Sequence, residues 1–446
     1  MRTLGTARFA PADHAARLGT RPVGQLLWRN CLQTTAAVGV YGVYALTNAW
    51  FVGRGVGDTA MAAVNLAAPL LLLLGAVSTT VGAGGASLIS RALGAGDHRA
   101  AARAAGNAFT LFWITAATTT VLGLLFLDPL LILLGAQGPL RDDARDYAFI
   151  LLCGALVSTG FSSLVRAEGR MGYSMMVWVV AVAVQIMLDP LLIFGLGMGV
   201  RGAALGTVGG QAVSVAMTLW FFFLQRDRPY RVPARALLPH GPTLRALVGV
   251  GLPSFLAGTG VTLLAVLVNA TLAASGAAAL AAYAVCARLQ TFAMMPHTGI
   301  GQGMQPIVGF NAGSGLTARV ARTRALALRG SLLYGLTTAA VFALLADPLV
   351  GLFLNDPATA AEAGDALRII AAGLAVAGIA PLAAAYFQAL GRPRPAYVLS
   401  IGTLLLIKAP LVAALGPTGT TGVWIGLAAG EIATAAVALV LLRVLR

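Results

Sequence analysis

The chain has 446 residues, of which 58% are hydrophobic and only 10% charged, and its mean hydropathy is +0.85. A soluble domain usually carries about 25% charged residues. Because this chain has too few polar residues to cover a water-facing globule, its composition excludes a cytoplasmic enzyme, a secreted disulfide scaffold and a disordered binding segment. It predicts an integral membrane protein, with the lipid bilayer as a partner.

The formal net charge of +15 would indicate nucleic-acid binding in a soluble protein. In a membrane protein, surplus Arg and Lys collect in cytoplasmic loops instead. We place 23 of the 30 basic residues on the cytoplasmic side, including those of the N-terminal tail, of 91–103, of the middle loop at 226–235 and of the C-terminal end, whereas the opposite ends of the spans hold nine of the 15 acids. We therefore expect a multi-pass protein of the cytoplasmic membrane, with both termini in the cytoplasm and no nucleic-acid partner.

The membrane spans are marked by stretches without Asp, Glu, Lys or Arg, since a span needs roughly 20 apolar residues. The stretch 246–287 is too long for one helix and is expected to break at 273–276. Lys408 and Glu431 interrupt the last stretches, which leaves two helices there. Twelve spans are predicted, from stretches at 30–53, 59–90, 104–127, 147–165, 171–188, 202–225, 246–287, 289–318, 330–346, 369–391, 395–407 and 409–430.

The two halves of the chain match each other at an offset near 220, which indicates an internal repeat. The tripeptide Asp-Pro-Leu occurs at 128–130 and again at 347–349. Matched glycine pairs include Gly55 with Gly276, Gly154 with Gly373, Gly172 with Gly391 and Gly206 with Gly426. Each half contains six helices, an even number, so the two repeats enter the membrane from the same side and are related by an axis along the membrane normal.

The predicted fold is an all-α integral membrane protein with twelve transmembrane helices in two pseudo-symmetric six-helix lobes. We expect a cytoplasmic tail at 1–24, an N-lobe at 25–225 with helices one to six, a cytoplasmic linker at 226–244 and a C-lobe at 245–446 with helices seven to twelve. Two similar bundles are typical of alternating-access transporters. A duplicated channel or structural protein is the alternative.

Asp189 is the main candidate for a functional residue, because a charged group inside a span is costly and is therefore usually functional. It ends a long uncharged run, and Gln185 lies one helical turn earlier on the same face. Pro190 donates no backbone hydrogen bond and so frees a carbonyl near the carboxylate. A desolvated carboxylate is a proton acceptor near neutral pH. The alternative places Asp189 in water at the outer interface.

Three further charged residues lie in or beside spans. Glu431 and Lys408, the single lysine of the chain, lie in neighbouring predicted helices and can form a buried structural pair or line a cavity. Arg288 either faces the cavity or extends to an interface.

Several uncharged residues can line a substrate cavity or simply join helices through hydrogen bonds. They are Tyr44 and Asn48 in the first helix, Thr207 in the sixth, and Gln302 and Gln305 in the eighth. The segment Met294-Met295-Pro296 suggests a bent helix with soft side chains, suited to apolar ligands, although core packing also explains it.

Metal and enzyme chemistry are not expected. Cys31, Cys153 and Cys286 lie in separate apolar runs without metal-ligand spacing, and the four histidines are scattered. A membrane-embedded enzyme would need clustered acids or histidines. The sequence therefore predicts no resident metal and no cofactor.

The chain resembles the MATE family, the multidrug and toxic compound extrusion transporters, over nearly its whole length, in a style nearest the prokaryotic DinF-like and MepA-like branches. The blocks that carry the resemblance are 48–53 (NAWFVG), 85–94 (GASLISRALG), 166–169 (RAEG), 188–190 (LDP), 199–204 (GVRGAA) and 301–313 (GQGMQPIVGFNAG).

The resemblance implies an antiporter that exports cationic or amphipathic small molecules, drugs or natural products, in exchange for H⁺ or Na⁺, as a monomer. Carried over by position, the coupling site comprises Asp189, Gln185, Asn48 and Thr207, and the chain departs from the family in having Asn48 where Asp is common. Substrate-cavity candidates are Tyr44, Met294, Gln302, Gln305, Arg288 and Glu431. A lipid or polysaccharide-precursor flippase of the same superfamily is the alternative.

Overall fold

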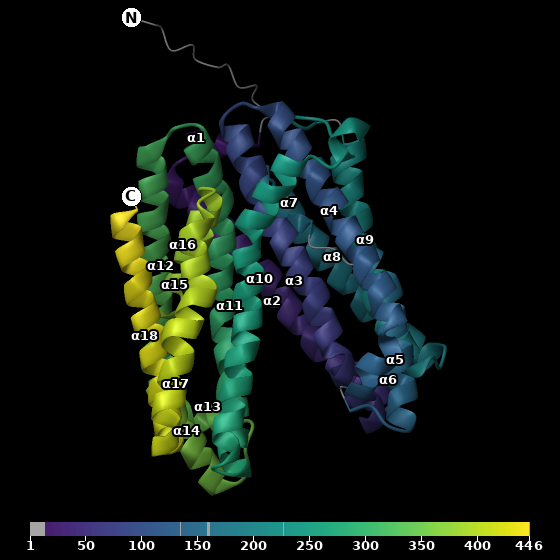
Figure 1. The fold of residues 1–446 in the computed structure, drawn as a ribbon, viewed down its shortest axis with the longest axis vertical. Coiled ribbons are helices and arrows are strands. Elements are labelled where there is room, and N and C mark those ends of the chain that lie inside the picture. Colours follow the sequence, from purple (N-terminus) through teal and green to yellow (C-terminus); the bar gives the residue numbers. More distant parts are fainter. Residues whose placement is uncertain (1–13, 134, 158–160, 226, 446) are drawn as a thin grey trace, which may run out of the picture. The chain divides into compact units, whose positions relative to one another are not determined.

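The computed structural model describes residues 14–133, 135–157, 161–225 and 227–445; within these, the side chains at 41, 44–46, 49, 55, 58–60, 68–74 and 139 are outside the description. All regular structure in this part of the chain is helical (Figure 1). Helices predominate because a segment in hydrocarbon must satisfy its own backbone hydrogen bonds. The helices of the first half are α1 (Ala16–Thr20), α2 (Val23–Gly55), α3 (Asp58–Gly94), α4 (His98–Leu125), α5 (Leu127–Leu133), α6 (Pro139–Gly154), α7 (Ser162–Ala167), α8 (Met171–Pro190) and α9 (Gly199–Leu219).

The second half repeats this order of helices. They are α10 (Gly241–Ala273), α11 (Ala277–Gly313), α12 (Thr317–Leu344), α13 (Ala346–Gly351), α14 (Pro357–Ala377), α15 (Ile379–Ala389), α16 (Pro393–Tyr397), α17 (Ala409–Leu415) and α18 (Thr420–Val444). The long stretch 246–287 breaks where the sequence predicts, because α10 ends at Ala273 and α11 begins at Ala277.

Ten helical segments among the described residues are long and apolar enough to cross a membrane. Helices α2 and α3 are not among these ten. They have 33 and 37 residues, and each is longer than the roughly 20 residues that a span needs. The predicted boundaries are wrong where a helix continues beyond the uncharged stretch: α12 begins at Thr317, not near 330, and its first turns carry Arg319, Arg322 and Arg324. Charged residues end the apolar run but do not end a helix.

The internal repeat is visible in helix lengths. Helices α2 and α10 both have 33 residues, α3 and α11 both have 37, and α4 and α12 both have 28. The turns repeat as well, through glycines with positive φ, a region that only glycine enters freely. The matched pairs are Gly57 with Gly276, Gly96 with Gly315, Gly169 with Gly391 and Gly199 with Gly419.

Two of the predicted glycine pairs are therefore wrong. Gly55 is the last residue of α2 and Gly172 lies in the first turn of α8, whereas Gly276 and Gly391 occupy left-handed turns between helices. Matching glycines by a constant offset alone paired Gly276 and Gly391 with glycines that lie two or three residues from their structural counterparts and have a different backbone conformation.

The chain divides into two compact units. Unit 1 comprises the described residues up to Leu26, Val43–Val248 and Pro306–Val320; unit 2 comprises Leu27–Gly42, Gly249–Gln305 and Ala321–Arg446. In unit 1, α3 packs against α4 and α6, and α8 against α9; in unit 2, α18 packs against α14, α15 and α17 (Figure 1). Each unit has its own buried apolar core. The division of the chain into lobes at 226–244 stays a prediction. The structure adds that the first part of α2, from Leu27 to Gly42, belongs to unit 2, and that the last part of α11, from Pro306 on, belongs to unit 1.

Candidate functional site

The candidate site lies between α8 and α9, with α2 beside it, inside unit 1. Asp189 is the penultimate residue of α8 and only 1% exposed. Its Oδ2 accepts a hydrogen bond from Asn48 Nδ2 at 3.2 Å, and its Oδ1 is buried without a hydrogen-bond partner among the described residues. A buried carboxylate oxygen without a partner is rare in folded proteins. The carboxylate is thus held by one amide and left half-satisfied.

Glycine 206 lets this carboxylate approach α9. A Cβ atom at Gly206 would lie 2.0 Å from Asp189 Oδ1, so only glycine fits there. One turn later, Gly210 faces the backbone of Ala181 and the Cβ of Gln185. Small residues spaced four apart allow close helix packing inside membranes. The sequence contained this signal as the run Gly202, Gly206, Gly210, of which Gly206 was matched to Gly426 only as a marker of the repeat.

Gln185 and Thr207 complete the buried polar group. Gln185 Nε2 donates to Thr207 Oγ1 at 2.8 Å, and Thr207 Oγ1 donates to the carbonyl of Ala203 at 3.1 Å. The structure therefore brings together all four residues predicted for the coupling site, as two neighbouring hydrogen-bonded pairs on α2, α8 and α9. Their role in coupling is not tested by this geometry.

The helix that carries Asp189 changes form directly after it. Pro190 lacks an N–H, so the carbonyl of Ile186 loses its helical donor. Residues Leu191–Gly195 then form a single π-helical turn, closed by Leu196 N donating to Leu191 O at 2.9 Å. Such π turns occur often at functional sites. Asp189 thus lies at a discontinuity of the span.

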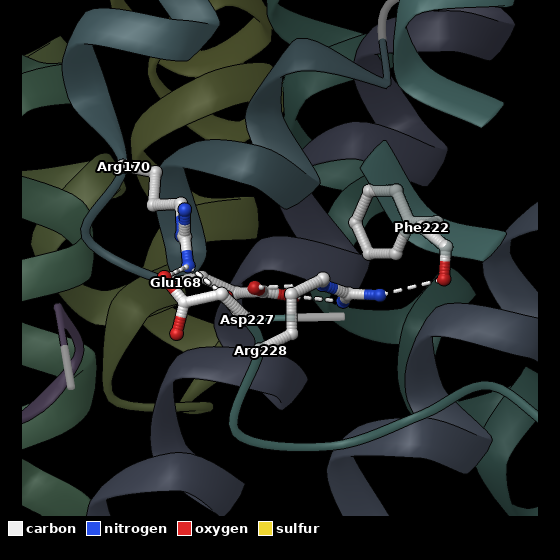
Figure 2. Close-up of polar contacts among 5 residues, drawn as sticks. All are labelled: Glu168, Arg170, Phe222, Asp227 and Arg228. Atoms are coloured by element: carbon white, nitrogen blue, oxygen red, sulfur yellow. Dashed lines mark hydrogen bonds and ion pairs between the residues drawn. The ribbon is translucent and has the colours of Figure 1, made fainter. Parts of the chain in front are cut away.

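A second charged cluster lies at the end of unit 1 that holds the linker (Figure 2). Arg228 and Glu168 form an ion pair in which both side chains are 1% exposed. Arg228 also donates to the carbonyl of Phe222 at 2.7 Å, and its guanidinium lies over the ring of Phe222 at 4.3 Å. Burial and the neighbouring Glu168 carboxylate raise the pKa of Tyr230, whose ring also contacts Arg228. The motif at 166–169 contains Glu168, but nothing in the sequence pattern indicated its pairing with Arg228.

The remaining predicted residues lie mainly in unit 2. Lys408 Nζ and Glu431 Oε1 are 2.5 Å apart, with side chains 21% and 27% exposed, so the predicted pair is formed. Met294 packs against the apolar core of unit 2 and Arg288 is exposed, both on α11, where Gln302 and Gln305 are partly buried. The structure does not gather them into one site. Tyr44 lies on α2, and its side chain is outside the described part.

Comparison with known proteins decides the family. The MatE family model matches residues 37–191 and 253–413, well over half of the chain. The chain belongs to the MATE family. It is therefore a multi-pass membrane transporter of small molecules and not an enzyme, and the resemblance read from its motifs is confirmed.

Relatives of this MATE transporter match along most of their length. It is 26% identical over 411 residues to the multidrug export protein MepA of Staphylococcus haemolyticus, which covers 91% of this chain and 90% of the relative. It is 26% identical over 407 residues to the FAD transporter of Shewanella oneidensis, covering 89% and 88%.

Solved MATE structures share the fold. A crystal structure of a MATE protein in complex with MaL6 superposes with a TM-score of 0.90 at 25% identity, covering 96% of this chain and 98% of that one. A MOP superfamily transporter from Pyrococcus furiosus gives a TM-score of 0.89 at 25% identity, covering 96% and 97%. The predicted fold, an all-α membrane protein of MATE type, is thereby confirmed.

Proposed function

We propose that this MATE transporter exports cationic or amphipathic small molecules, drugs or natural products, from the cytoplasm in exchange for an inward-moving cation. The two six-helix lobes work by alternating access, and the coupling ion is H⁺, with Na⁺ as the alternative. The transporter acts as a monomer in the cytoplasmic membrane with both termini in the cytoplasm, and it carries no resident cofactor.

The observation that carries this proposal is the half-satisfied carboxylate of Asp189 inside a span. Placing an ionised group inside a span costs free energy, so such a group is usually kept for a function. Its two oxygens are unequal: Oδ2 accepts from the Asn48 amide, whereas Oδ1 faces Gly206 and has no donor among the described residues. Oδ1 is thus the atom at which a proton binds with the least loss of existing hydrogen bonding.

Proton binding changes the forces at the end of α8. The neutral carboxyl group attracts the Asn48 amide less strongly than the carboxylate does, because hydrogen bonds to ionised groups are roughly twice as strong as neutral ones. Proton binding also removes the negative charge of Asp189 from the packed contact between α8 and α9, beside Pro190 and the π turn. These elements can then move relative to α9, which reshapes the lobe and releases the substrate outward.

The substrate class rests on the relatives. Several are named multidrug export proteins, and one is named an FAD transporter. The first name agrees with the scarcity of charge inside this chain, since a permissive drug site is mostly apolar. FAD, a large anion, serves as the contrasting substrate in the test below.

The test uses purified transporter in liposomes, with a fluorescent cationic dye and FAD assayed under separate pH and sodium gradients. We expect the wild type to move the dye against its gradient when a pH gradient is imposed, and Asp189→Asn to lose this accumulation. Asp146→Asn is the matched control, because Asp146 is a partly exposed acid paired with Arg201 outside the apolar core. Dye accumulation by Asp189→Asn at the wild-type rate would contradict the proposal, and accumulation driven by sodium alone would select Na⁺.

A further inference from the structure

His297 is a buried ionisable residue of unit 2 that the proposed coupling site does not use. It lies near the middle of the span Ala277–Gly313 and is 4% exposed. Neither Nδ1 nor Nε2 has a hydrogen-bond partner in the part of the chain that the structure describes. Most buried polar side-chain atoms are paired, so two unpaired nitrogens on one ring need an explanation.

The imidazole occupies a break in a neighbouring span. The ring lies so close to Gly378 that a Cβ there would be 1.6 Å from His297 Cδ2. Gly378 is the residue that separates α14 from α15. Because a larger residue at 378 would displace the ring, the position of His297 and the conformation of this break are coupled.

No opposite charge faces the ring. From α12, Tyr334 contacts it edge-on at 5.0 Å between centroids, but the Tyr334 hydroxyl donates to the carbonyl of Ala293. From α2, Thr34 and Thr35 pack on the next half-turn of α11 at Gly299, and neither titrates. Among the described residues no carboxylate lies within ion-pair distance of His297. A charged imidazolium buried here would be uncompensated and therefore strongly unfavourable.

We infer that His297 is a second proton-binding group of this transporter, in the unit that does not contain Asp189. In the dry packing described above the ring is neutral. It binds a proton when the break at Gly378 opens and water reaches the two free nitrogens. Histidine suits this role because its charge changes within the physiological pH range. The inference rests on the proposed export function and adds to it a proton site in the C-terminal half.

The first experiment measures proton binding without transport. The full-length protein in liposomes is labelled with ¹⁵N in its four histidine rings, and His297→Gln identifies the His297 signal by its loss. His240→Gln, at an exposed position of the linker, is the matched assignment control. We expect the His297 signal to convert from the neutral to the charged ring as the pH is lowered while the protein stays folded. A ring that stays neutral at every pH at which the protein is folded overturns the inference.

The second experiment measures coupling. His297→Phe keeps a ring against Gly378 and removes both nitrogens, and His297→Gln serves if the phenylalanine variant does not fold. We expect the pH dependence of dye export to flatten and the effect of the pH gradient to fall by at least about fivefold, the lower end of coupling between two sites. His240→Gln keeps the wild-type profile. A wild-type profile in folded His297 variants refutes the role, whereas absence of dye export by the wild type refutes the proposed function and leaves the labelling experiment decisive.

Discussion

At the scale of single residues, Gly206 decides whether Asp189 can sit against α9. We predict that Gly206→Ala displaces the carboxylate, because the added Cβ would lie 2.0 Å from Oδ1. The overpacking should cost about 1–3 kcal/mol of unfolding free energy and should also reduce coupled export. Gly258→Ala on α10 is the control, since nothing lies within 4 Å of its added Cβ. Thermal unfolding and dye export are the measurements, and equal behaviour of the two variants would show that the contact at Gly206 does not matter.

Asn48 offers a second residue-scale prediction. Asn48→Asp places a second carboxyl group where the amide nitrogen now lies 3.2 Å from Asp189 Oδ2. Two carboxylates this close cannot both ionise, so the pair retains one proton. We expect dye export by the variant to extend to more alkaline pH than in the wild type. The pH profile of export in liposomes is the measurement, and an unchanged profile would separate Asn48 from the coupling step.

The sequence pattern predicted Asp189 and Gln185, and the family resemblance added Asn48 and Thr207, but neither gave the geometry of this site. Asp189 stood out because an acid inside a span is rare, and Gln185 because it lies one turn earlier. Nothing in the sequence tells which of three glycines on α9 the carboxylate faces. That depends on the rotation of α8 against α9, which packing sets and which the apolar pattern leaves open, since apolar residues lie on every side of both helices.

At the scale of elements, the linker is fastened to unit 1 and does not hang free. Asn107 on α4 donates to the carbonyls of Ala236 and Leu238 and accepts from His240 N, and Thr110 donates to the carbonyl of Leu237. The buried Arg228–Glu168 pair holds the other end of the same segment (Figure 2). The linker up to His240 therefore moves with unit 1.

Removing one member of this pair should destabilise unit 1. In Glu168→Gln, Arg228 keeps its charge without a counter-charge, which we expect to cost about 3–5 kcal/mol. The control Asp227→Asn removes a carboxylate that is 68% exposed and pairs with Arg170, so it should cost only about 0–1 kcal/mol. Thermal unfolding of the purified protein and protease cleavage within 227–240 are the measurements. Equal losses in both variants would mean that the buried pair does not fasten the linker.

Helices α3 and α11 show what the pattern of apolar residues leaves undetermined. Within unit 1 they cross at Gly94 and Gly313, where an added Cβ would lie 2.0 Å from the backbone oxygens of Phe310 and Arg91 respectively. Both pairs are related by the offset of the repeat, so the crossing is itself pseudo-symmetric. The sequence predicted the repeat, but it could not show that the end of α11 packs in unit 1. An apolar helix face indicates that the face is covered, but it does not indicate which element covers it.

At the scale of the whole molecule, the net charge of +15 is unevenly compensated. Four acids of the predicted outer side pair with arginines there: Asp128 with Arg141 and Arg145, Asp146 with Arg201, and Asp347 and Asp365 with Arg368. The predicted cytoplasmic side holds 23 of the 30 basic residues but only a minority of the 15 acids, so its net charge is strongly positive. The charge that orients a membrane protein is the excess of Arg and Lys in its short loops, so the predicted orientation follows from where the arginines lie and not from the ion pairs of the outer side.

The topology prediction can be checked by thiol labelling in intact cells. In a variant whose Cys31, Cys153 and Cys286 are replaced by Ala, single cysteines are placed by Asp142→Cys and Arg235→Cys, both at exposed positions. An impermeant maleimide should label the first in intact cells and the second only after the membrane is opened, because 235 lies in the basic linker and 142 in the acid-rich end. Each variant must retain dye export, so that labelling reports on folded protein. Labelling of Arg235→Cys from outside would invert the orientation, and with it the direction in which the Asp189 site must receive its proton.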